Sequence, residues 1–179
     1  MMKITGLIAG MLLLASGVYA QADIQKLRPT VKAAAKKMND ALVKKNLAEF
    51  VKTTHPKVIE GTPGGAEKIV KDLEAQLSAI EKDGANIVSA WTGEASPIID
   101  TAGEYQCTIP QYMKRNIKDP KGVLITQTTL MAISQDKGKT WYFVDATDKT
   151  LAQWKTVFPT LSSKLVIKPS PEPKFEPAK

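Results

Sequence analysis

The chain has 179 residues, of which 43% are apolar and 24% are charged, and its formal net charge is +7. This length suits one ordinary globular domain, and the apolar fraction excludes intrinsic disorder of the whole chain. A chain of this size can bury about two thirds of its unfolded surface, so its stability requires no disulfide, metal or repeat array.

Residues 1–20 follow the order of a secretory signal peptide. Lys3 is their only charge, an apolar run extends from Ile4 to Ala15, and the segment ends in Val18-Tyr19-Ala20. This predicts cleavage near Ala20 and a secreted or periplasmic mature chain that starts at Gln21. An uncleaved anchor is the disfavoured alternative, because no positively charged flank follows. The remaining chain has no apolar stretch long enough to cross a bilayer, so we expect no stable membrane span.

Apolar residues at intervals of three and four predict three helices before Gly84. The second begins at Asn46, with Glu49 placed as in a capping box, and stops before His55-Pro56. The third follows a cluster of helix-breaking residues at 61–65. In chain order, the apolar positions are Leu27, Val31, Ala34, Ala35, Met38 and Leu42; Phe50 and Val51; and Ala66, Ile69, Val70, Leu73, Leu77 and Ile80.

Beyond Gly84 the apolar period shortens to two, which predicts β-strands. Helices first and strands afterwards, without β-α-β alternation, indicate an α+β fold with an antiparallel sheet. The only cysteine, Cys107, alternates with Tyr105 and Ile109 on one strand face, so we expect it to be a small buried side chain. The predicted strand segments are 87–92, 97–100, 105–109, 123–134 and 140–146.

The segment from Ser134 to Trp141 matches the Asp-box pattern, S-x-D-x-G-x-T-W. The motif resembles hairpins of sialidase propellers but also occurs singly on unrelated folds. We expect Asp136 to accept hydrogen bonds from turn amides, Gly138 to adopt a positive φ and Trp141 to pack under the turn. A propeller would need several copies at a regular period. The motif therefore predicts a stabilised hairpin rather than a catalytic or sugar-binding site.

The C-terminal part combines apolar and proline-rich stretches. Residues 151–158 predict a short helical turn that covers an edge of the sheet, and residues 164–168 predict a terminal extended segment. Four prolines then alternate with Ser, Glu and Lys. We therefore expect one domain over residues 21–160 and a mobile, partly polyproline-like Pro/Lys-rich tail over residues 161–179.

The positive charge is nearly all lysine, since the only arginines are Arg28 and Arg115. Nucleic-acid sites usually contain arginine forks and stacking aromatic residues, so we expect no nucleic-acid partner. One histidine and one cysteine make no cluster with metal-ligand spacing, and no Gly-rich phosphate loop stands out. We therefore expect neither a metal nor a cofactor.

Several segments together form a recognisable pattern. They are Met38-Asn39-Asp40-Ala41-Leu42, Leu47-Ala48-Glu49-Phe50, Thr54-His55-Pro56, Gly64-Gly65, and Ile133-Ser134-Gln135-Asp136 with Gly138, Trp141, Phe143, Val144 and Asp145. In this order they resemble the nuclear transport factor 2-like (SnoaL-like) superfamily, over about residues 25–150. The resemblance implies N-terminal helices packed on a curved antiparallel sheet, a cone-like, cystatin-like fold with a central cavity. Members include dehydratases and isomerases as well as non-catalytic binding or dimerising domains.

The candidate catalytic residues are His55, Asp100 and Asp145. His55 is the only histidine, and it could act as a general base if the fold brought either aspartate to its ring. The favoured interpretation is structural, with the imidazole hydrogen-bonded to a helix end. Asp145 alternates with Trp141 and Phe143 and would share their face, which makes it the best candidate for a functional carboxylate. The other interpretation places Asp145 at a strand end, facing water.

The leading hypothesis is a non-catalytic domain that binds a small apolar or amphipathic ligand or an interaction partner in the cavity. One alternative is a small lyase or isomerase that uses the His/Asp pair with a tyrosine hydroxyl as donor. Another is a structural homodimer formed through the open sheet face. The residues expected to bind the ligand are Trp91, Tyr105, Gln127, Tyr142 and Phe143, with Asp145 as a polar anchor.

Overall fold

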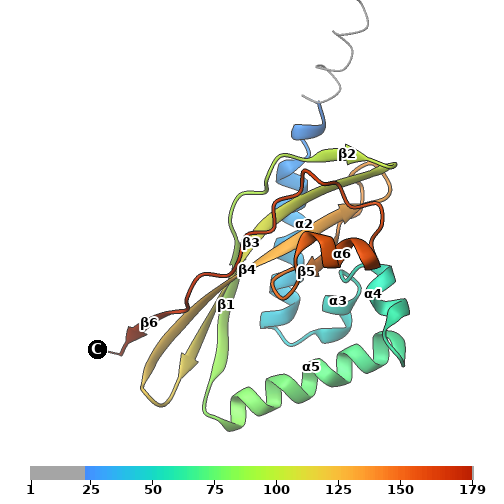
Figure 1. Cartoon of the computed structure of the whole chain (residues 1–179). Coiled ribbons are helices and arrows are strands. Elements are labelled where there is room, and N and C mark those ends of the chain that lie inside the picture. The colour runs from blue at the N-terminus through green and yellow to red at the C-terminus, as the bar shows by residue number, and fades with distance from the viewer. Residues whose placement is uncertain (1–22, 179) are drawn as a thin grey trace, which may run out of the picture.

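The computed structural model describes residues 23–178, so the predicted signal peptide and its cleavage site lie outside the described residues. Within the described part, a six-stranded antiparallel sheet has helices on one face, and a short helix with extended chain on the other (Figure 1). The predicted α+β class and the antiparallel sheet are confirmed.

The N-terminal half of the described chain is helical. The Asn46 side chain accepts a hydrogen bond from the backbone N–H of Glu49 and caps α3, in agreement with the sequence pattern. Gly64, with φ of 87°, provides the left-handed turn before α5. Helix α4 was not predicted, because its six residues are too few to show a helical period. The bounds are α2 Arg28–Val43, α3 Leu47–Val51, α4 Pro56–Gly61 and α5 Gly65–Lys82.

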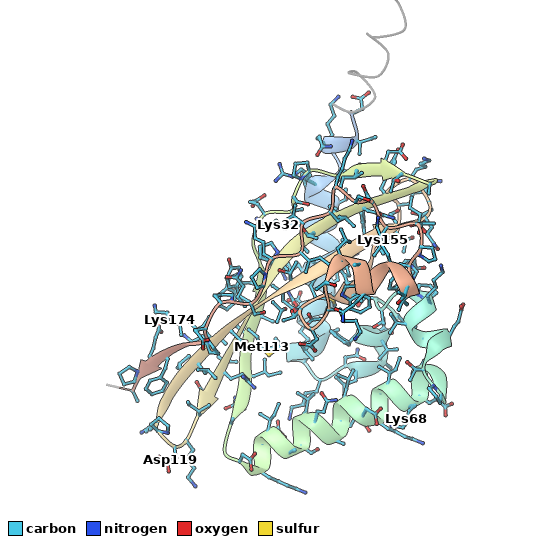
Figure 2. All side chains as sticks on the ribbon, viewed as in Figure 1. Lys32, Lys68, Met113, Asp119, Lys155 and Lys174 are labelled. Carbon is cyan, nitrogen blue, oxygen red and sulfur yellow. The ribbon has the colours of Figure 1, made fainter. Side chains whose placement is uncertain are left out.

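The sheet is built around the long hairpin of β3 and β4. The strands are β1 Asn86–Thr92, β2 Ile99–Thr101, β3 Glu104–Ile117, β4 Gly122–Ser134, β5 Tyr142–Asp145 and β6 Lys174–Pro177. Their main order is β1-β3-β4-β5; β2 pairs with one end of β3, and β6 pairs with β4 near the hairpin tip, where Figure 2 labels Asp119.

Alternate residues of β3 divide the sheet into two faces. The face that carries Cys107, Ile109, Gln111, Met113 and Arg115 is called the inner face, and the opposite one the outer face. Opposite residues of an antiparallel pair share a face, so Ala132 and Leu130 of β4 join Cys107 and Ile109 there. Helix α2 packs on this end of the inner face, and Cys107 is fully buried in the resulting core, as predicted.

The outer face is covered by α6, Leu151–Val157, and by the segment 158–168, which we call the strap. Apolar side chains of the strap are buried against Met131 and Ile133 of β4. The predicted helical turn at 151–158 is thus confirmed as α6. The strap side chains in this cluster are Phe158, Leu161, Leu165 and Ile167.

Polar residues of the outer face bind the backbone of the strap. The Gln106 amide donates to Thr160 O at 3.2 Å and accepts from Ser162 N–H at 2.9 Å. The hydroxyl groups of Thr108 and Thr129 donate to Val166 O and Lys168 O at 3.2 and 3.0 Å. These bonds satisfy backbone groups that would otherwise be buried without partners.

The predicted boundary between the domain and a tail at residue 160 is therefore corrected. Residues 161–168 are part of the packed outer layer, and Lys174–Pro177 forms strand β6 on β4. A mobile tail was predicted because the prolines at 169–177 alternate with Ser, Glu and Lys, a composition that can bury little apolar surface. The sheet instead supplies side-chain donors and acceptors to this segment, an arrangement that composition does not reveal.

The Asp box has the geometry that the sequence predicts. The Asp136 carboxylate accepts from Thr140 N–H and from the Ser134 hydroxyl, both at 2.8 Å, and Gly138 has φ of 86°. The Trp141 indole N–H donates to Gly138 O at 3.1 Å. A Cβ at Gly138 would lie 2.6 Å from Leu27, so the turn is packed tightly against the start of α2. The motif closes one end of the core.

Candidate binding cavity

A cavity of about 910 Å³ lies between the inner face of the sheet and the helices. Helix α2 fills the inner face only at the end that carries Cys107 and Ile109. Toward the hairpin tip, residues of α5 and of β1, β3 and β4 line the cavity together; Figure 1 shows α5 ending beside the start of β1. The lining from the helices includes Met38, Leu42, Phe50, Leu73, Leu77 and Ile80.

Helix α5 provides the most unusual part of this lining. Leu73, Leu77 and Ile80 follow one stripe of the helix, which is the pattern of a helix packed against a core. None of the 18 residues of α5 is buried, however. The apolar stripe faces the cavity and is only partly covered.

The opposite wall is the inner face near the hairpin tip. Gln111, Met113 and Arg115 of β3 line the cavity, together with Thr126 of β4 and Ile87 of β1. Met113, which Figure 2 labels, lies on the side of β3 that faces the helices. The wall follows from the strand period, because these residues alternate with outward-facing ones.

Two buried amides link α2 to the cavity wall. Gln111 Nε2 donates to Asn39 Oδ1 at 2.5 Å, and the Thr128 hydroxyl donates to Gln111 Oε1 at 3.3 Å. Asn39 is fully buried, and its Nδ2 has no hydrogen-bond partner among the described residues. This chain of amides holds the wall of the cavity against α2.

Arg115 is the other polar group with an unmet donor. Its Nε is buried and has no hydrogen-bond partner in the described part of the chain. Within residues 23–178, Arg115 also takes part in no ion pair. A buried donor without an acceptor is costly, so an acceptor beside Arg115 Nε would be stabilising.

The end of the cavity at β5 carries both signs of charge. Lys57, Lys149 and Asp145 line it. The Asp145 carboxylate accepts from the backbone N–H of Thr147 at 2.9 Å and from its hydroxyl at 2.5 Å. The two ammonium groups lie over aromatic rings, Lys149 over Trp154 at 5.1 Å and Lys57 over Phe158 at 6.0 Å.

Of the six residues expected to bind a ligand, Phe143 and Asp145 line the cavity. Tyr105 is on the inner face but beyond the cavity, with the Lys137 ammonium 4.8 Å from its ring centre. Trp91, Gln127 and Tyr142 are outside the lining as well. Trp91 is 41% exposed and stacks on Tyr112, with ring centres 5.4 Å apart.

The predicted set missed Gln111 and Arg115. Both have the same strand parity as Cys107 and Ile109, whereas Gln127 pairs with Tyr112 on the outer face. Parity within β3 was therefore a usable signal, provided that the strand was extended to its real end at Ile117. The lining of α5 could not be recognised, because cavity helices and core helices share one apolar pattern.

His55 lies outside the cavity lining. It is 1% exposed, and its ring packs edge-on against Phe158 and Tyr142 at centre distances of 4.8 and 5.9 Å. Its Nδ1 accepts from Lys57 N–H at 3.2 Å, so the imidazole caps α4. Burial lowers the pKa of His55, against the opposing effect of the Glu104 charge.

The two candidate aspartates are engaged elsewhere. Asp100 faces the Lys137 ammonium at 3.7 Å, and Asp145 closes the turn at Thr147. Among residues 23–178, no hydrogen bond joins His55 to either carboxylate, and His55 Nε2 has no partner. The described residues thus bring together groups suited to binding, without a hydrogen-bonded histidine–aspartate pair.

No group of three His, Cys, Asp or Glu residues in the range 23–178 could hold a metal ion. None of the helices in this range is both long enough and apolar enough to span a bilayer. No protein-family model, no curated protein and no solved structure matches the chain.

Proposed function

We propose that this protein is a secreted or periplasmic, non-catalytic module that binds a small apolar or amphipathic molecule in the cavity. The observation that carries the proposal is the incomplete burial of α5. The apolar stripe of this helix lines a cavity of about 910 Å³, and none of the residues of α5 is buried. A helix normally buries such a stripe against the core. The volume lies within the range of small-molecule sites, about 300–1,000 Å³.

The arrangement of layers supports a cone-like, nuclear transport factor 2-like fold for this module. Helix α2 covers one end of the inner face, and α5 stands off from the other end across the cavity. The sequence resemblance leads us to expect a sheet that bends around the helices into a cone with a central cavity. Secretion rests on the sequence of residues 1–20.

The enzyme alternative is less well supported by the geometry. A general base needs hydrogen-bond reach to its substrate and an orienting partner. His55 is packed between aromatic rings outside the cavity lining, and its Nδ1 is used by the cap of α4. Binding, by contrast, needs only the apolar walls and the few polar groups that line the cavity.

A neutral fluorescent probe tests the proposal directly. N-phenyl-1-naphthylamine should bind saturably, one molecule per chain, with an increase in its emission. Leu77→Trp places a large ring in the cavity and should weaken this binding by about tenfold or more, as expected when apolar contacts of about 1.4 kcal/mol are lost. Val88→Trp is the matched control, because Val88 is 42% exposed and lies outside the lining.

The result that would overturn the proposal is the absence of saturable binding by the wild-type chain. Equal binding by the Leu77→Trp and Val88→Trp variants would also overturn it, because the probe would then be bound at another surface. Circular dichroism of both variants establishes that each is folded before binding is measured.

A further inference from the structure

The polar groups of the cavity are distributed unevenly between its two ends. Arg115 pairs with Leu124 of β4, whereas Asp145 pairs with Leu130. These β4 positions are six residues apart, which corresponds to about 20 Å along an extended strand. The cavity therefore runs between a guanidinium at one end and a mixed group of charges at the other.

The region between these ends is mostly apolar, although Gln76, Gln111 and Thr126 also line it. Leu73, Leu77 and Ile80 of α5 face Met113 and Ile87 of the sheet. Carboxylates are absent from this stretch of the lining in the described residues, since Asp145 at the far end is the only acidic residue among those that line the cavity. A ligand that extends along this path meets aliphatic side chains over most of its length.

The two ends differ in how the protein itself engages their positively charged side chains. Lys57 and Lys149 rest on aromatic rings, and an anion placed between them would meet the Asp145 carboxylate. The buried Nε of Arg115 has no hydrogen-bond partner, and Arg115 takes part in no ion pair, among the described residues. A guanidinium fork is suited to bidentate binding of a carboxylate or a phosphate.

We propose that the ligand of the cavity is an anionic amphiphile, a long unbranched apolar chain whose carboxylate or phosphate head binds Arg115. This inference rests on the proposed binding function and adds the chemical class of the ligand and its orientation. The chain lies along α5 and Met113. The head group completes the hydrogen bonding of a buried donor that the protein itself leaves without an acceptor.

The experiment compares three competitor compounds whose alkyl chains have the same length: palmitate, hexadecyl phosphate and hexadecanol. For each compound, displacement of N-phenyl-1-naphthylamine from the wild-type protein is measured at concentrations below the onset of micelle formation. We expect at least one of the two anions to bind about tenfold or more tightly than the alcohol, as a charge-assisted hydrogen bond of about 1.5–3 kcal/mol predicts. The anion that is preferred distinguishes a free fatty acid from a phosphate-headed lipid as the source.

Two variants locate the head group. Arg115→Met keeps the length of the side chain and removes the charge, so the preference for the anion over hexadecanol should disappear while hexadecanol still binds. Lys114→Met is the matched control, because Lys114 is the next residue of β3 and lies on the outer face. It removes the same charge and should leave the preference unchanged.

The outcomes separate this inference from the proposed function. Wild-type chain that binds palmitate, hexadecyl phosphate and hexadecanol equally would overturn the anionic ligand and leave the binding function standing. If none of the three compounds displaces N-phenyl-1-naphthylamine from the wild-type chain, the inference is overturned as well. A preference that survives Arg115→Met would show that the head group lies elsewhere, and it would contradict the assigned orientation. The comparison of anion and alcohol on wild-type chain needs no variant, so a misfolded Arg115→Met protein does not prevent the test.

Discussion

The two faces of the sheet are covered in different ways. On the outer face, the strap and α6 bury Phe158, Leu161 and Leu165 against β4, and side-chain amides and hydroxyls of the sheet bind the strap backbone. On the inner face, α2 is packed closely, but α5 leaves its apolar stripe partly exposed above a cavity. Both faces thus have a buried apolar cluster, but the part of the inner face beside α5 borders a cavity.

This difference indicates that different regions of the fold contribute to stability and to the proposed binding function. Burying a large apolar side chain contributes about 1.5–3 kcal/mol, so the outer face and the α2 end of the inner face carry most of the stabilisation. The residues of α5 contribute less than their hydrophobicity would allow, because they are only partly buried. Mutations in the two regions should therefore separate into changes of stability and changes of binding.

The largest expected effect is on the outer face. Phe158→Ala should lower the free energy of unfolding by about 3–5 kcal/mol, because Phe158 is 2% exposed and its removal leaves a cavity among Trp154, His55 and β4. Urea denaturation monitored by tryptophan fluorescence measures the change. Val157→Ala is the control, since Val157 is 42% exposed and should change stability by less than about 1 kcal/mol. Similar losses for both variants would contradict a closely packed outer face.

A second effect on the outer face depends on pH. The pKa of His55 is lowered because burial disfavours the charged imidazole. A lowered pKa in the folded state means that stability is complete above the ordinary value of about 6.5 and decreases as the pH falls below it, because the unfolded chain then binds the proton more readily. Since His55 is the only histidine, stability measured from pH 7.5 to pH 5 reports mainly on this residue.

The variant His55→Asn removes the ionisable ring and retains an acceptor for the backbone N–H of Lys57. Its overall stability should fall, but the decrease between pH 7.5 and pH 5 should become shallower than in the wild-type chain. An unchanged slope would mean that another group causes the pH dependence.

A smaller effect is expected at the Asp box, which closes the packed end of the inner face. Hydrogen bonds from Thr140, first of all from its backbone N–H, lower the pKa of Asp136 to about 2. Its contribution is therefore present above the ordinary pKa of 3.8 and is lost as the pH falls toward 2. Asp136→Asn should cost about 1 kcal/mol at neutral pH, a value kept small by solvent exposure of the carboxylate.

The measurement is urea denaturation at pH 7 and at pH 2.5, where the difference in free energy of unfolding between wild type and Asp136→Asn should be smaller than at pH 7. Asp148→Asn provides the control, because Asp148 is also exposed and lies outside the Asp box. A constant difference between wild type and Asp136→Asn across this pH range would mean that the carboxylate charge does not stabilise the turn.

Local patterns were sufficient for much of the fold. The helical spacing of Val31, Ala35 and Met38, the cap at Asn46 and the Asp-box sequence each determine structure within a few residues, and each was predicted. The strap was missed because its buried state depends on Gln106 and other residues more than 50 positions away along the chain. The prolines of residues 169–177, which follow the strap directly, indicated a solvated tail.

The family resemblance led us to expect a central cavity, and the residues expected to bind a ligand include only part of the wall of the cavity beside α5. Phe143 and Asp145 were named, whereas Gln111 and Arg115 were not, because the predicted strand ended at residue 109 and the real β3 continues to Ile117. The contribution of α5 depends on how far the helix stands from the sheet, and spacing of apolar residues in the sequence cannot define that distance.

The smallest expected effect on stability is at α5. Leu77→Ala should lower the free energy of unfolding by less than about 1 kcal/mol, because Leu77 is only partly buried and alanine is the best helix former. Binding of N-phenyl-1-naphthylamine should weaken in the same variant, since Leu77 lines the cavity. A leucine in a packed core would instead cost about 2–5 kcal/mol on truncation. A loss of that size, without a change in probe binding, would mean that α5 completes the core as the strap does, and the distinction between the two faces would no longer hold.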